Sequence, residues 1–358
     1  MTSVGGDGRL RPVTDLDEPA AGAYLPTTDE IVVATSAGGG EHTQLYLVRD
    51  DGRELRPLLV DPDHIHRLGG ATRDGRLLAV ATNARTGADF DVVVVAVDDP
   101  SNRRVVFDRG GWVQPRGFSP DGRWLAVSRM TARSGDDELF LVDVAGGDIV
   151  EVAPHDQPVR LGAPAWRADG SSFFFSTDCD RDFRAIALFD LATRSWRYVL
   201  ERDGDTDCAL DWSGRQLLVE TEREGCTVAE LVDPDSLATL RTVPLPGPGS
   251  AGLGFSRDGG LLAYSFTSAR EPGDVWVYRC RDGTTTRLTT MPRGVDADHL
   301  VEPTVHRIAS FDGEMISLFV YHPAPGGPGG PAPVVVSLHG GPESQHRPAF
   351  DPLVQYLV

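Results

Sequence analysis

The chain has 358 residues, with 53 acidic side chains against 34 arginines and no lysine, and therefore a formal net charge of −19. This acidic balance argues against nucleic acid and anionic membrane surfaces as partners, because phosphate binding requires clustered basic side chains. An apolar content of 40% is ordinary for a soluble globular protein, and the lack of lysine excludes a Schiff-base lysine or a P-loop from the sequence.

Residues 1–20 form a predicted N-terminal extension whose first ten residues hold no apolar run, which indicates that no signal peptide is present. No later stretch approaches the roughly 18 apolar residues of a membrane-spanning helix. The cysteines include no CxxC pair, so neither a zinc site nor a disulfide framework is indicated; they are Cys179, Cys208, Cys226 and Cys280. We therefore expect buried free thiols, no metal, no cofactor and a cytoplasmic location.

A repeat of about 45 residues dominates residues 21–297. Its marker is a polar turn followed by an apolar strand, and the turn glycines lie 47, 48, 44 and 45 residues apart, at Gly75, Gly122, Gly170, Gly214 and Gly259. A degenerate first copy precedes the apolar segment 31–34. After each marker come another apolar strand, a polar turn and a further strand. Four short antiparallel strands at this period are typical of a β-propeller blade, so we predict six blades and leave a seventh open.

The marker turns have a local physical cause. In Ser119-Pro120-Asp121-Gly122, proline supplies a φ near −65°, aspartate bonds to nearby backbone and glycine takes a positive φ. None of the turns shows the alternating D-x-D-x-D-G ligand spacing of a calcium loop. The repeated aspartates are therefore predicted to be turn residues rather than metal ligands.

From about residue 298 the repeat stops and a different class of structure begins. Residues 305–310 and 315–321, separated by the turn Asp312-Gly313, predict a β-hairpin. A Pro- and Gly-rich loop, 323–333, then leads to the unbroken apolar run 334–338, which is typical of a strand buried in a parallel sheet.

The sequence His339-Gly340-Gly341-Pro342 follows that run directly. Glycine lets a backbone approach a substrate carbonyl closely and point N–H groups at it, as the loops of acyl-transfer enzymes do. Asp351 and Pro352 then predict a helix N-terminus. Apolar residues spaced for one helical face surround that start: Phe350, Leu353, Val354 and Leu357.

The repeat resembles the propeller repeat of TolB and of the non-catalytic domain of prolyl oligopeptidase-type enzymes. The segments Ser310–Ile316, His339–Gln345 and Phe350–Leu357 closely resemble the S9 prolyl oligopeptidase family, nearest its acylaminoacyl-peptidase and dipeptidyl-peptidase-like members. In that family a propeller precedes an α/β-hydrolase domain. The predicted fold class is therefore an all-β propeller over 21–297, followed by the start of an α/β-hydrolase domain over 298–358.

The resemblance implies a serine peptidase with a Ser-Asp-His triad, in which the backbone N–H of Gly341, with Gly340 shaping the loop, forms part of the oxyanion hole. No serine of the sequence stands in a G-x-S-x-G elbow, and the family pattern places the triad beyond the helix that begins at Pro352. We therefore expect this chain to end before the triad and to be inactive alone.

The substrates expected from the resemblance are short peptides or acylated amino acids, with the propeller restricting access to the active site. No propeller residue is singled out as a substrate contact, and the oligomeric state stays undetermined. The alternative is a non-catalytic propeller that serves as a binding scaffold and carries a vestigial hydrolase segment.

Overall fold

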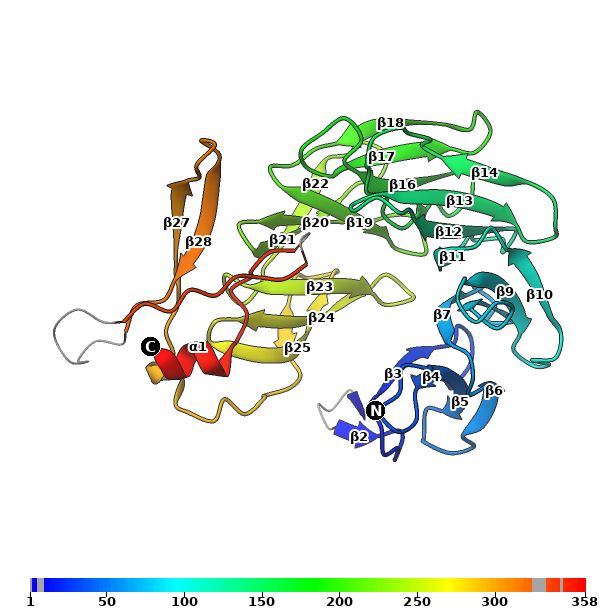
Figure 1. The fold of residues 1–358 in the computed structure, drawn as a ribbon, viewed down its shortest axis with the longest axis horizontal. Helices are drawn as coiled ribbons and strands as arrows, with labels where there is room; N and C mark the ends of the chain where they lie inside the picture. The colour runs from blue at the N-terminus through cyan, green and yellow to red at the C-terminus, as the bar shows by residue number, and fades with distance from the viewer. Residues whose placement is uncertain (1, 5–9, 324–332, 342–343) are drawn as a thin grey trace. The chain divides into compact units, whose positions relative to one another are not determined.

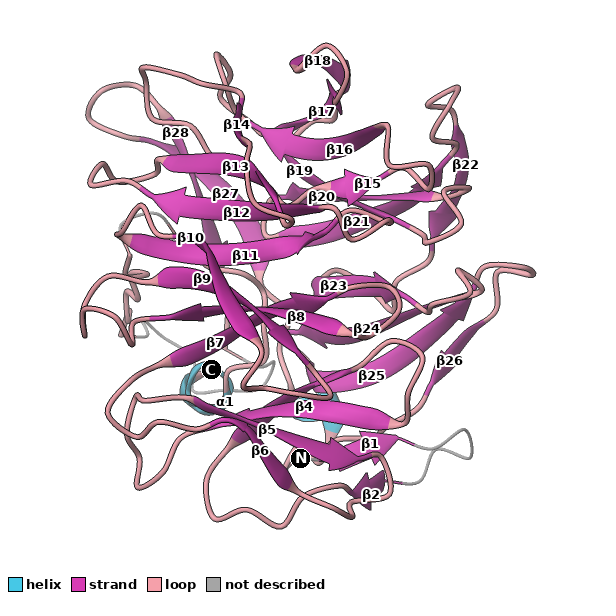
Figure 2. Cartoon of the chain, turned by 90° about the vertical axis from the view of Figure 1, so that its right-hand side faces the viewer, coloured by secondary structure: helices cyan, strands magenta, loops and turns pink. Residues whose placement is uncertain are grey.

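The structure, a computed structural model, describes residues 2–4, 10–323, 333–341 and 344–358. The chain forms two compact units, Met1–Leu200 and Glu201–Val358. Strands make up nearly all of the regular structure (Figures 1 and 2).

The first unit holds four antiparallel four-stranded sheets, and each sheet uses four strands that are consecutive in the chain. The first two sheets are β3 (Ala20–Tyr24), β4 (Glu30–Thr35), β5 (Gln44–Arg49) and β6 (Arg56–Leu59), then β7 (His66–Ala71), β8 (Leu77–Thr82), β9 (Asp91–Ala96) and β10 (Arg103–Phe107). The next two are β11 (Trp112–Phe118), β12 (Trp124–Met130), β13 (Asp137–Asp143) and β14 (Ile149–Val152), then β15 (Ala165–Trp166), β16 (Ser172–Thr177), β17 (Ala185–Asp190) and β18 (Ser195–Leu200). A separate antiparallel pair, β1 (Thr2–Val4) and β2 (Leu10–Pro12), precedes them.

The second unit holds two more sheets of the same kind and a C-terminal segment. Its sheets are β19 (Asp205–Leu210), β20 (Leu217–Arg223), β21 (Cys226–Val232) and β22 (Thr239–Val243), then β23 (Ser250–Phe255), β24 (Leu261–Ser268), β25 (Glu271–Arg279) and β26 (Thr285–Arg287). The C-terminal segment contains a 3₁₀ turn η1 (Ala297–His299), the hairpin β27 (Thr304–Ala309) and β28 (Met315–Val320), and helix α1 (Pro352–Leu357). Among the described residues, no helix is long and apolar enough to cross a membrane.

These sheets confirm the six blades counted from the sequence, and the fold is that of a six-bladed β-propeller. No seventh blade forms in the described part of the chain. The N-terminal residues contribute only the two-stranded pair β1–β2, and the stretch between residues 293 and 302 contains only the turn η1.

The repeated turns hold their shape through their own aspartates. Asp121 Oδ1 accepts hydrogen bonds from the Ser119 hydroxyl at 2.6 Å and from the backbone N–H of Arg123 at 3.1 Å, while Gly122 has a φ of +72°. Equivalent contacts recur in the turns that begin at Thr72 and Ser256. The aspartates thus act as turn residues, as the sequence predicts.

Turns of consecutive sheets also fit against each other within the first unit. A Cβ at Gly75 would lie 2.2 Å from the carbonyl oxygen of Pro26, in the turn of the sheet before it. A Cβ at Gly122 would lie 3.3 Å from the side chain of Thr72, which belongs to the preceding turn. Glycine is therefore required at Gly75 both by its positive φ and by the close approach of the neighbouring turn.

Within each unit, hydrophobic clusters fill the space between consecutive sheets. In the cluster shared by the third and fourth sheets, Phe173 stacks on Phe189 with ring centroids 5.0 Å apart and lies 4.7 Å from the ring of Trp166. β16 is buried along its whole length because neighbouring side chains cover both of its faces. Burying one large apolar side chain contributes about 1.5–3 kcal/mol to the stability of the fold. A strand that is covered on both faces gains this stabilisation at successive positions, which explains the apolar run in the second strand of each repeat.

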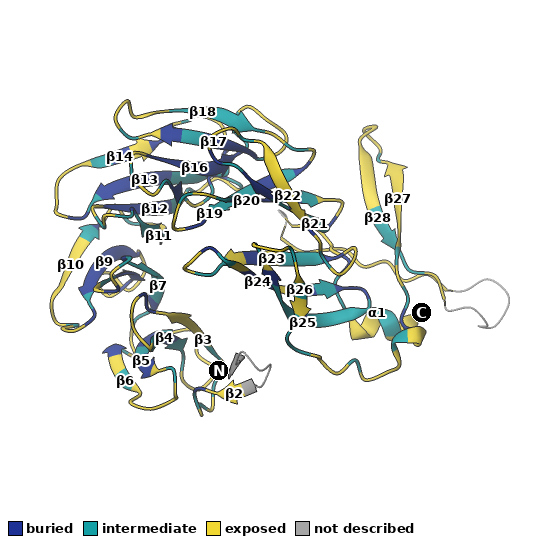
Figure 3. Ribbon diagram, turned by 180° about the vertical axis from the view of Figure 1, so that it is seen from behind, coloured by how far each residue is buried: buried dark blue, intermediate teal, exposed yellow. Residues whose placement is uncertain are grey.

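Burial differs sharply between these sheets and the hairpin. Figure 3 shows buried residues concentrated in the middle strands of the sheets, whereas β27 is exposed along its length. The hairpin itself pairs from Thr304–Val320 to Ala309–Met315, which confirms the hairpin predicted from the sequence.

Candidate functional site

The predicted oxyanion loop, residues 339–341, is exposed and has no regular secondary structure. Gly341 has a φ of +137°, a conformation that favours glycine, and a Cβ added at Gly340 would meet no heavy atom within 4 Å. His339 Nδ1 lies 3.0 Å from the carbonyl oxygen of Gly340. Pro342, which completes the motif, lies outside the described residues. The oxyanion role of Gly340 and Gly341 therefore stays a prediction.

The strand expected over residues 334–338 does not form. The segment has no strand pairing, and Val334, Val335, Val336 and Leu338 are 86%, 70%, 76% and 86% exposed. A strand in a parallel sheet exists only through hydrogen bonds to its neighbours, and no described strand pairs with this segment. The apolar run is real, but the sheet that would order it is not among the described residues.

The helix expected after this loop is present. Asp351 caps α1 by accepting hydrogen bonds from the backbone N–H groups of Leu353 at 2.8 Å and Val354 at 3.2 Å. The apolar face predicted for it is only partly covered: Phe350 and Val354 are half-buried, whereas Leu353 is 63% and Leu357 is 51% exposed. The helix prediction is thus confirmed, and half of its apolar face stays open among the described residues.

A polar side chain, rather than that apolar face, anchors α1. Gln355 Nε2 donates to the carbonyl oxygens of Ala269 and Val301, both at 2.9 Å, and its Oε1 accepts the Val301 N–H at 2.8 Å. Just before the helix, the N–H of Phe350 donates to the Thr267 hydroxyl at 3.3 Å. These bonds join α1 to the hairpin between β24 and β25. Sequence reasoning missed this anchor because a lone glutamine carries no pattern.

Two ion pairs attach the C-terminal segment to the fifth sheet. Arg307 on β27 contacts Glu224 at 2.7 Å, and Arg347 contacts Glu222 at 3.0 Å. Directly after Glu224, a Cβ at Gly225 would lie 2.8 Å from the ring of Phe319, so the hairpin fits tightly over the β20–β21 turn. The segment that carries the family resemblance is therefore held against one defined turn of the fifth sheet.

Four carboxylates gather on one face of the β19–β20 ladder. Asp205 is paired opposite Glu222, and Asp207 opposite Glu220. Burial raises the pKa of Glu220 to about 7, the nearby Asp207 adds to the rise, and a hydrogen bond from the Leu253 N–H opposes it. This face favours positive charge, and Arg347 already occupies its Glu222 end. The alternation of acids along two strands was visible in the sequence but was not recognised as one surface.

The cysteines are free, as expected, but half-buried rather than buried. Burial is the largest cause that raises the pKa of the thiols of Cys179, Cys226 and Cys280. A raised pKa keeps a thiol protonated at neutral pH and makes it a poor nucleophile. The arrangement therefore gives no support to cysteine chemistry at these positions.

No known protein-family profile matches the chain, and no curated protein matches it in sequence. Solved structures do match its fold. A puromycin-hydrolysing peptidase of Mycobacterium tuberculosis superposes with a TM-score of 0.79 at 17% identity, over 98% of this chain and 59% of that one. A puromycin hydrolase gives a TM-score of 0.79 at 19% identity, over 99% and 60%.

Prolyl oligopeptidase B from Galerina marginata gives a TM-score of 0.63 at 14% identity, over 83% of this chain and 46% of that one. This chain therefore spans about half to three fifths of the length of the peptidases that it matches. The similarity extends over both units, blades and C-terminal segment alike, in the two puromycin-hydrolysing proteins. The chain has the fold found in part of the prolyl oligopeptidase (S9) type of peptidase.

Proposed function

We propose that the chain is the propeller-containing part of a serine-type peptidase of the prolyl oligopeptidase type, which cleaves short peptides or acylated amino acids. The observation that carries the proposal is the fold match over 98–99% of the chain to peptidases that are substantially longer. The motif His339-Gly340-Gly341, placed directly after an apolar run, supports it independently of the fold.

In this proposal the chemistry is acyl transfer. A serine attacks the scissile carbonyl, a histidine takes the serine proton and later gives it to the leaving amine, and an aspartate orients the histidine. None of these three residues is assigned to a position of this chain. The chain contributes the backbone N–H of Gly341, which stabilises the negative charge that develops on the carbonyl oxygen.

The propeller contributes selection by size. Consecutive sheets of the first unit are tightly packed against each other, and on this proposal substrate reaches an enclosed active site only as a small molecule or a short unfolded peptide. The ion pairs of Arg307 and Arg347 and the bonds of Gln355 hold the start of the hydrolase segment on the fifth and sixth sheets. Cleavage of short peptides without cleavage of folded proteins is the expected result.

A fluorophosphonate probe tests the proposal. The full-length product of the gene that encodes this chain is expected to be labelled, and residues 1–358 alone are expected to stay unlabelled. A gene product that lacks a G-x-S-x-G elbow beyond residue 358, or one that the probe does not label, overturns the peptidase proposal. The matched control replaces the elbow serine by alanine and must abolish labelling.

The oxyanion assignment has its own test in the same full-length enzyme. Gly341→Pro removes the N–H donor, and the loss of one such donor typically lowers kcat by about 10²–10³-fold. Gly340→Ala is the comparison, because a Cβ there meets open space and both N–H groups are kept. Equal activity of Gly341→Pro and the parent enzyme contradicts the assignment.

One observation favours a second candidate, a non-catalytic propeller scaffold. The apolar run 334–338 forms no strand and is exposed among the described residues, as a vestigial segment would be. The probe experiment separates the two, because a scaffold stays unlabelled at full length.

A further inference from the structure

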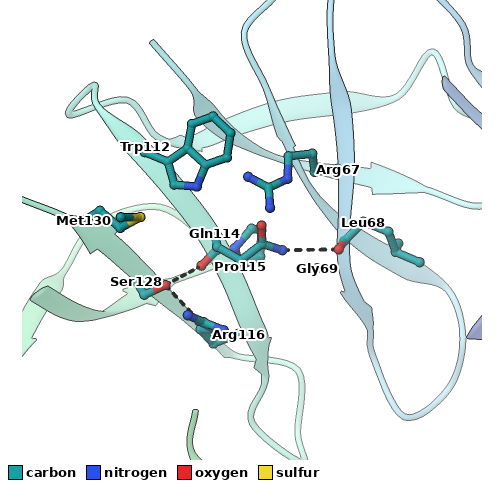
Figure 4. A pocket seen from close by; sticks show the side chains of 9 residues that line it. All are labelled: Arg67, Leu68, Gly69, Trp112, Gln114, Pro115, Arg116, Ser128 and Met130. Carbon is teal, nitrogen blue, oxygen red and sulfur yellow. Dashed lines mark hydrogen bonds between the residues drawn. The ribbon is translucent and has the colours of Figure 1, made fainter. Parts of the chain in front are cut away.

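A pocket of about 280 Å³ lies between β7 and β11, the first strands of the second and third sheets (Figure 4). It is smaller than the roughly 300–1,000 Å³ of sites for drug-sized ligands, so it suits a group about the size of one amino acid. All of its lining residues belong to the first unit. The sequence singled out none of them.

The two strands form this pocket because both contain an irregularity at the same level. The pairing shifts between Leu68 and Gly70 on one strand and between Pro115 and Gly117 on the other. A Cβ at Gly69 would lie 2.2 Å from Cβ of Pro115, so the strands touch there and side chains on either side of the contact are redirected. Bulges that re-aim side chains are frequent beside functional sites.

The side chains of Arg67 and Arg116 lie within electrostatic range of each other, and Arg116 is also within range of the Asp137 carboxylate. Neither Arg67 nor Arg116 forms an ion pair with a described carboxylate. Asp137, the acid within electrostatic range of Arg116, lies 3.9 Å from Arg160 instead. Burial, and then the charge of Arg116, lowers the pKa of Arg67.

The chain carries 53 acids against 34 arginines, and other arginines of the same sheets are matched, as in Arg85–Asp91 and Arg129–Glu138. Two neighbouring cations in so acidic a chain are expected to have an anionic ligand.

Hydrogen-bonding capacity in the pocket is also unfilled. Arg67 is held over the ring of Trp112, 4.5 Å from its centroid, and its Nη1 is buried without a hydrogen-bond partner. Arg116 uses Nε to donate to Ser128 at 2.8 Å. Gln114 donates through Nε2 to the Leu68 carbonyl oxygen at 3.3 Å, which leaves its buried Oε1 as an acceptor without a donor.

The unmet groups define a ligand. The two guanidinium groups are suited to a carboxylate, and the unpaired oxygen of Gln114 is suited to an N–H group next to that carboxylate. The exposed surfaces of Trp112 and Met130 are suited to an apolar side chain. A carboxylate, a neighbouring amide N–H and a side chain are the three substituents of an N-acylated α-amino acid. Figure 4 shows Arg67 and Gln114 directed toward the same space, with Arg116 beside Ser128.

We infer that this pocket binds the α-carboxylate end of an N-acylated amino acid, with Arg67 and Arg116 on the carboxylate and Gln114 Oε1 accepting the adjacent N–H. A free N-acyl amino acid and the C-terminal residue of a peptide share this chemistry. The inference does not depend on the peptidase proposal, because binding is measured directly and without turnover.

Calorimetry on residues 1–358 with four small ligands tests the chemistry. N-acetyl-leucine is expected to bind, N-acetyl-leucinamide at least 10-fold more weakly because it lacks the carboxylate, and 4-methylpentanoate several-fold more weakly because it lacks the N–H. Inorganic phosphate is expected to bind more weakly than N-acetyl-leucine. Equal affinity for acid and amide, or phosphate binding as tightly as the acid, overturns the inference.

A further ligand distinguishes the two sources. N-acetyl-alanyl-leucine that binds as well as N-acetyl-leucine identifies a peptide C-terminus. Binding of N-acetyl-leucine alone identifies a free acyl amino acid. Either result supports the site, and failure of both ligands to bind refutes it.

Variants assign the residues. Arg67→Gln and Arg116→Gln are each expected to weaken N-acetyl-leucine binding at least 10-fold, whereas Arg104→Gln, at the opposite edge of the second sheet, leaves it unchanged. Gln114→Met is expected to weaken N-acetyl-leucine but not 4-methylpentanoate. Arg116→Gln removes a like charge from beside Arg67, so the unliganded melting temperature is not expected to fall.

That last readout separates binding from folding. A variant that lost affinity through misfolding would also melt lower without ligand. Unchanged affinity in the Arg67→Gln and Arg116→Gln variants contradicts the assignment, and the comparison of acid with amide on the unaltered chain decides the question even where a variant fails to fold.

Discussion

A buried ion pair in the third sheet gives the sharpest test of how this fold is held together. Asp136 and His155 are 5% and 8% exposed, and Asp136 Oδ1 lies 2.9 Å from His155 Nε2. Burial alone would lower the pKa of His155, but bonds to the Ala153 carbonyl oxygen and to Asp136 outweigh it and raise that pKa. Both ring nitrogens lie within hydrogen-bond distance of an oxygen acceptor, an arrangement that favours the protonated imidazole.

The perturbation is Asp136→Asn, which removes the charge and keeps the shape. Removing one partner of a buried pair costs about 3–5 kcal/mol. An asparagine oxygen in the place of Oδ1 still accepts the Val159 N–H, now at 3.1 Å, and its amide group in the place of Oδ2 can donate to the Thr131 hydroxyl oxygen, now at 2.7 Å. We therefore expect a loss of about 3 kcal/mol in the free energy of unfolding, the lower end of that range.

The loss depends on pH with a defined sign. The pKa of His155 is raised in the folded protein, so its stabilisation is complete below the ordinary value of 6.5 and disappears as pH rises through the folded pKa. Burial alone would raise the pKa of Asp136, but bonds from Thr131, His155 and Val159 lower it, so its stabilisation is complete above 3.8 and is lost in stronger acid. The penalty of the substitution is therefore largest at about pH 5 and smaller at about pH 9.

The penalty is measured by urea unfolding of residues 1–358, followed by tryptophan fluorescence at about pH 5, about pH 7 and about pH 9. Asp182→Asn, at an exposed position of the same unit, is the control and is expected to change stability by less than about 0.5 kcal/mol. A penalty below about 1 kcal/mol at the acidic setting, or one that does not change between the extremes, refutes the reasoning.

Three further predictions follow from single positions. Gly69→Ala places a Cβ 2.2 Å from the proline of β11 and is expected to cost about 1–3 kcal/mol in urea unfolding, whereas Gly147→Ala, with open space around it, is expected to be neutral. Burial lowers the pKa of His66, whose ring nitrogens have no hydrogen-bond partner, so stability falls as pH drops below 6.5; His66→Leu should remove up to about 1.4 kcal/mol per pH unit of that slope, read from unfolding at paired pH values. The double variant Val334→Asp and Val336→Asp replaces side chains that are 86% and 76% exposed, and light scattering should show less self-association than in the parent chain; equal scattering would contradict the role of this apolar run.

The propeller was predictable because its signals are local. A turn such as Ser119–Gly122 fixes its own shape through bonds of its own side chains, and its recurrence at 44 to 48 residues marks each blade. The hairpin β27–β28 and the cap of α1 by Asp351 are local in the same sense, and both were predicted correctly.

The C-terminal apolar run was mispredicted because its structure is not local. Residues 334–338 have the composition of a buried strand, but strand geometry comes from hydrogen bonds to neighbouring strands. Leu353 and Leu357 show the same dependence, since helical spacing marks an apolar face without supplying the surface that covers it. The composition of a segment indicates which secondary structure it is suited to form, and the neighbouring strands or surfaces determine whether it forms that structure.

The pocket of Arg67 and Arg116 shows what the repeat adds to sequence reasoning. The shifted pairs that begin at Leu68 and Pro115 are 115 − 68 = 47 residues apart, which is one repeat, so equivalent positions of consecutive blades become neighbours in space. Gln114 stands one repeat after Arg67, and Gly69 one repeat before Arg116, so the two arginines come from different positions beside the same bulge. Like charges brought together in this way cost stability unless a ligand or an opposite charge lies between them. Arginines that flank the bulge in the first strands of adjacent repeats are thus a sequence signal for a candidate anion site in a propeller.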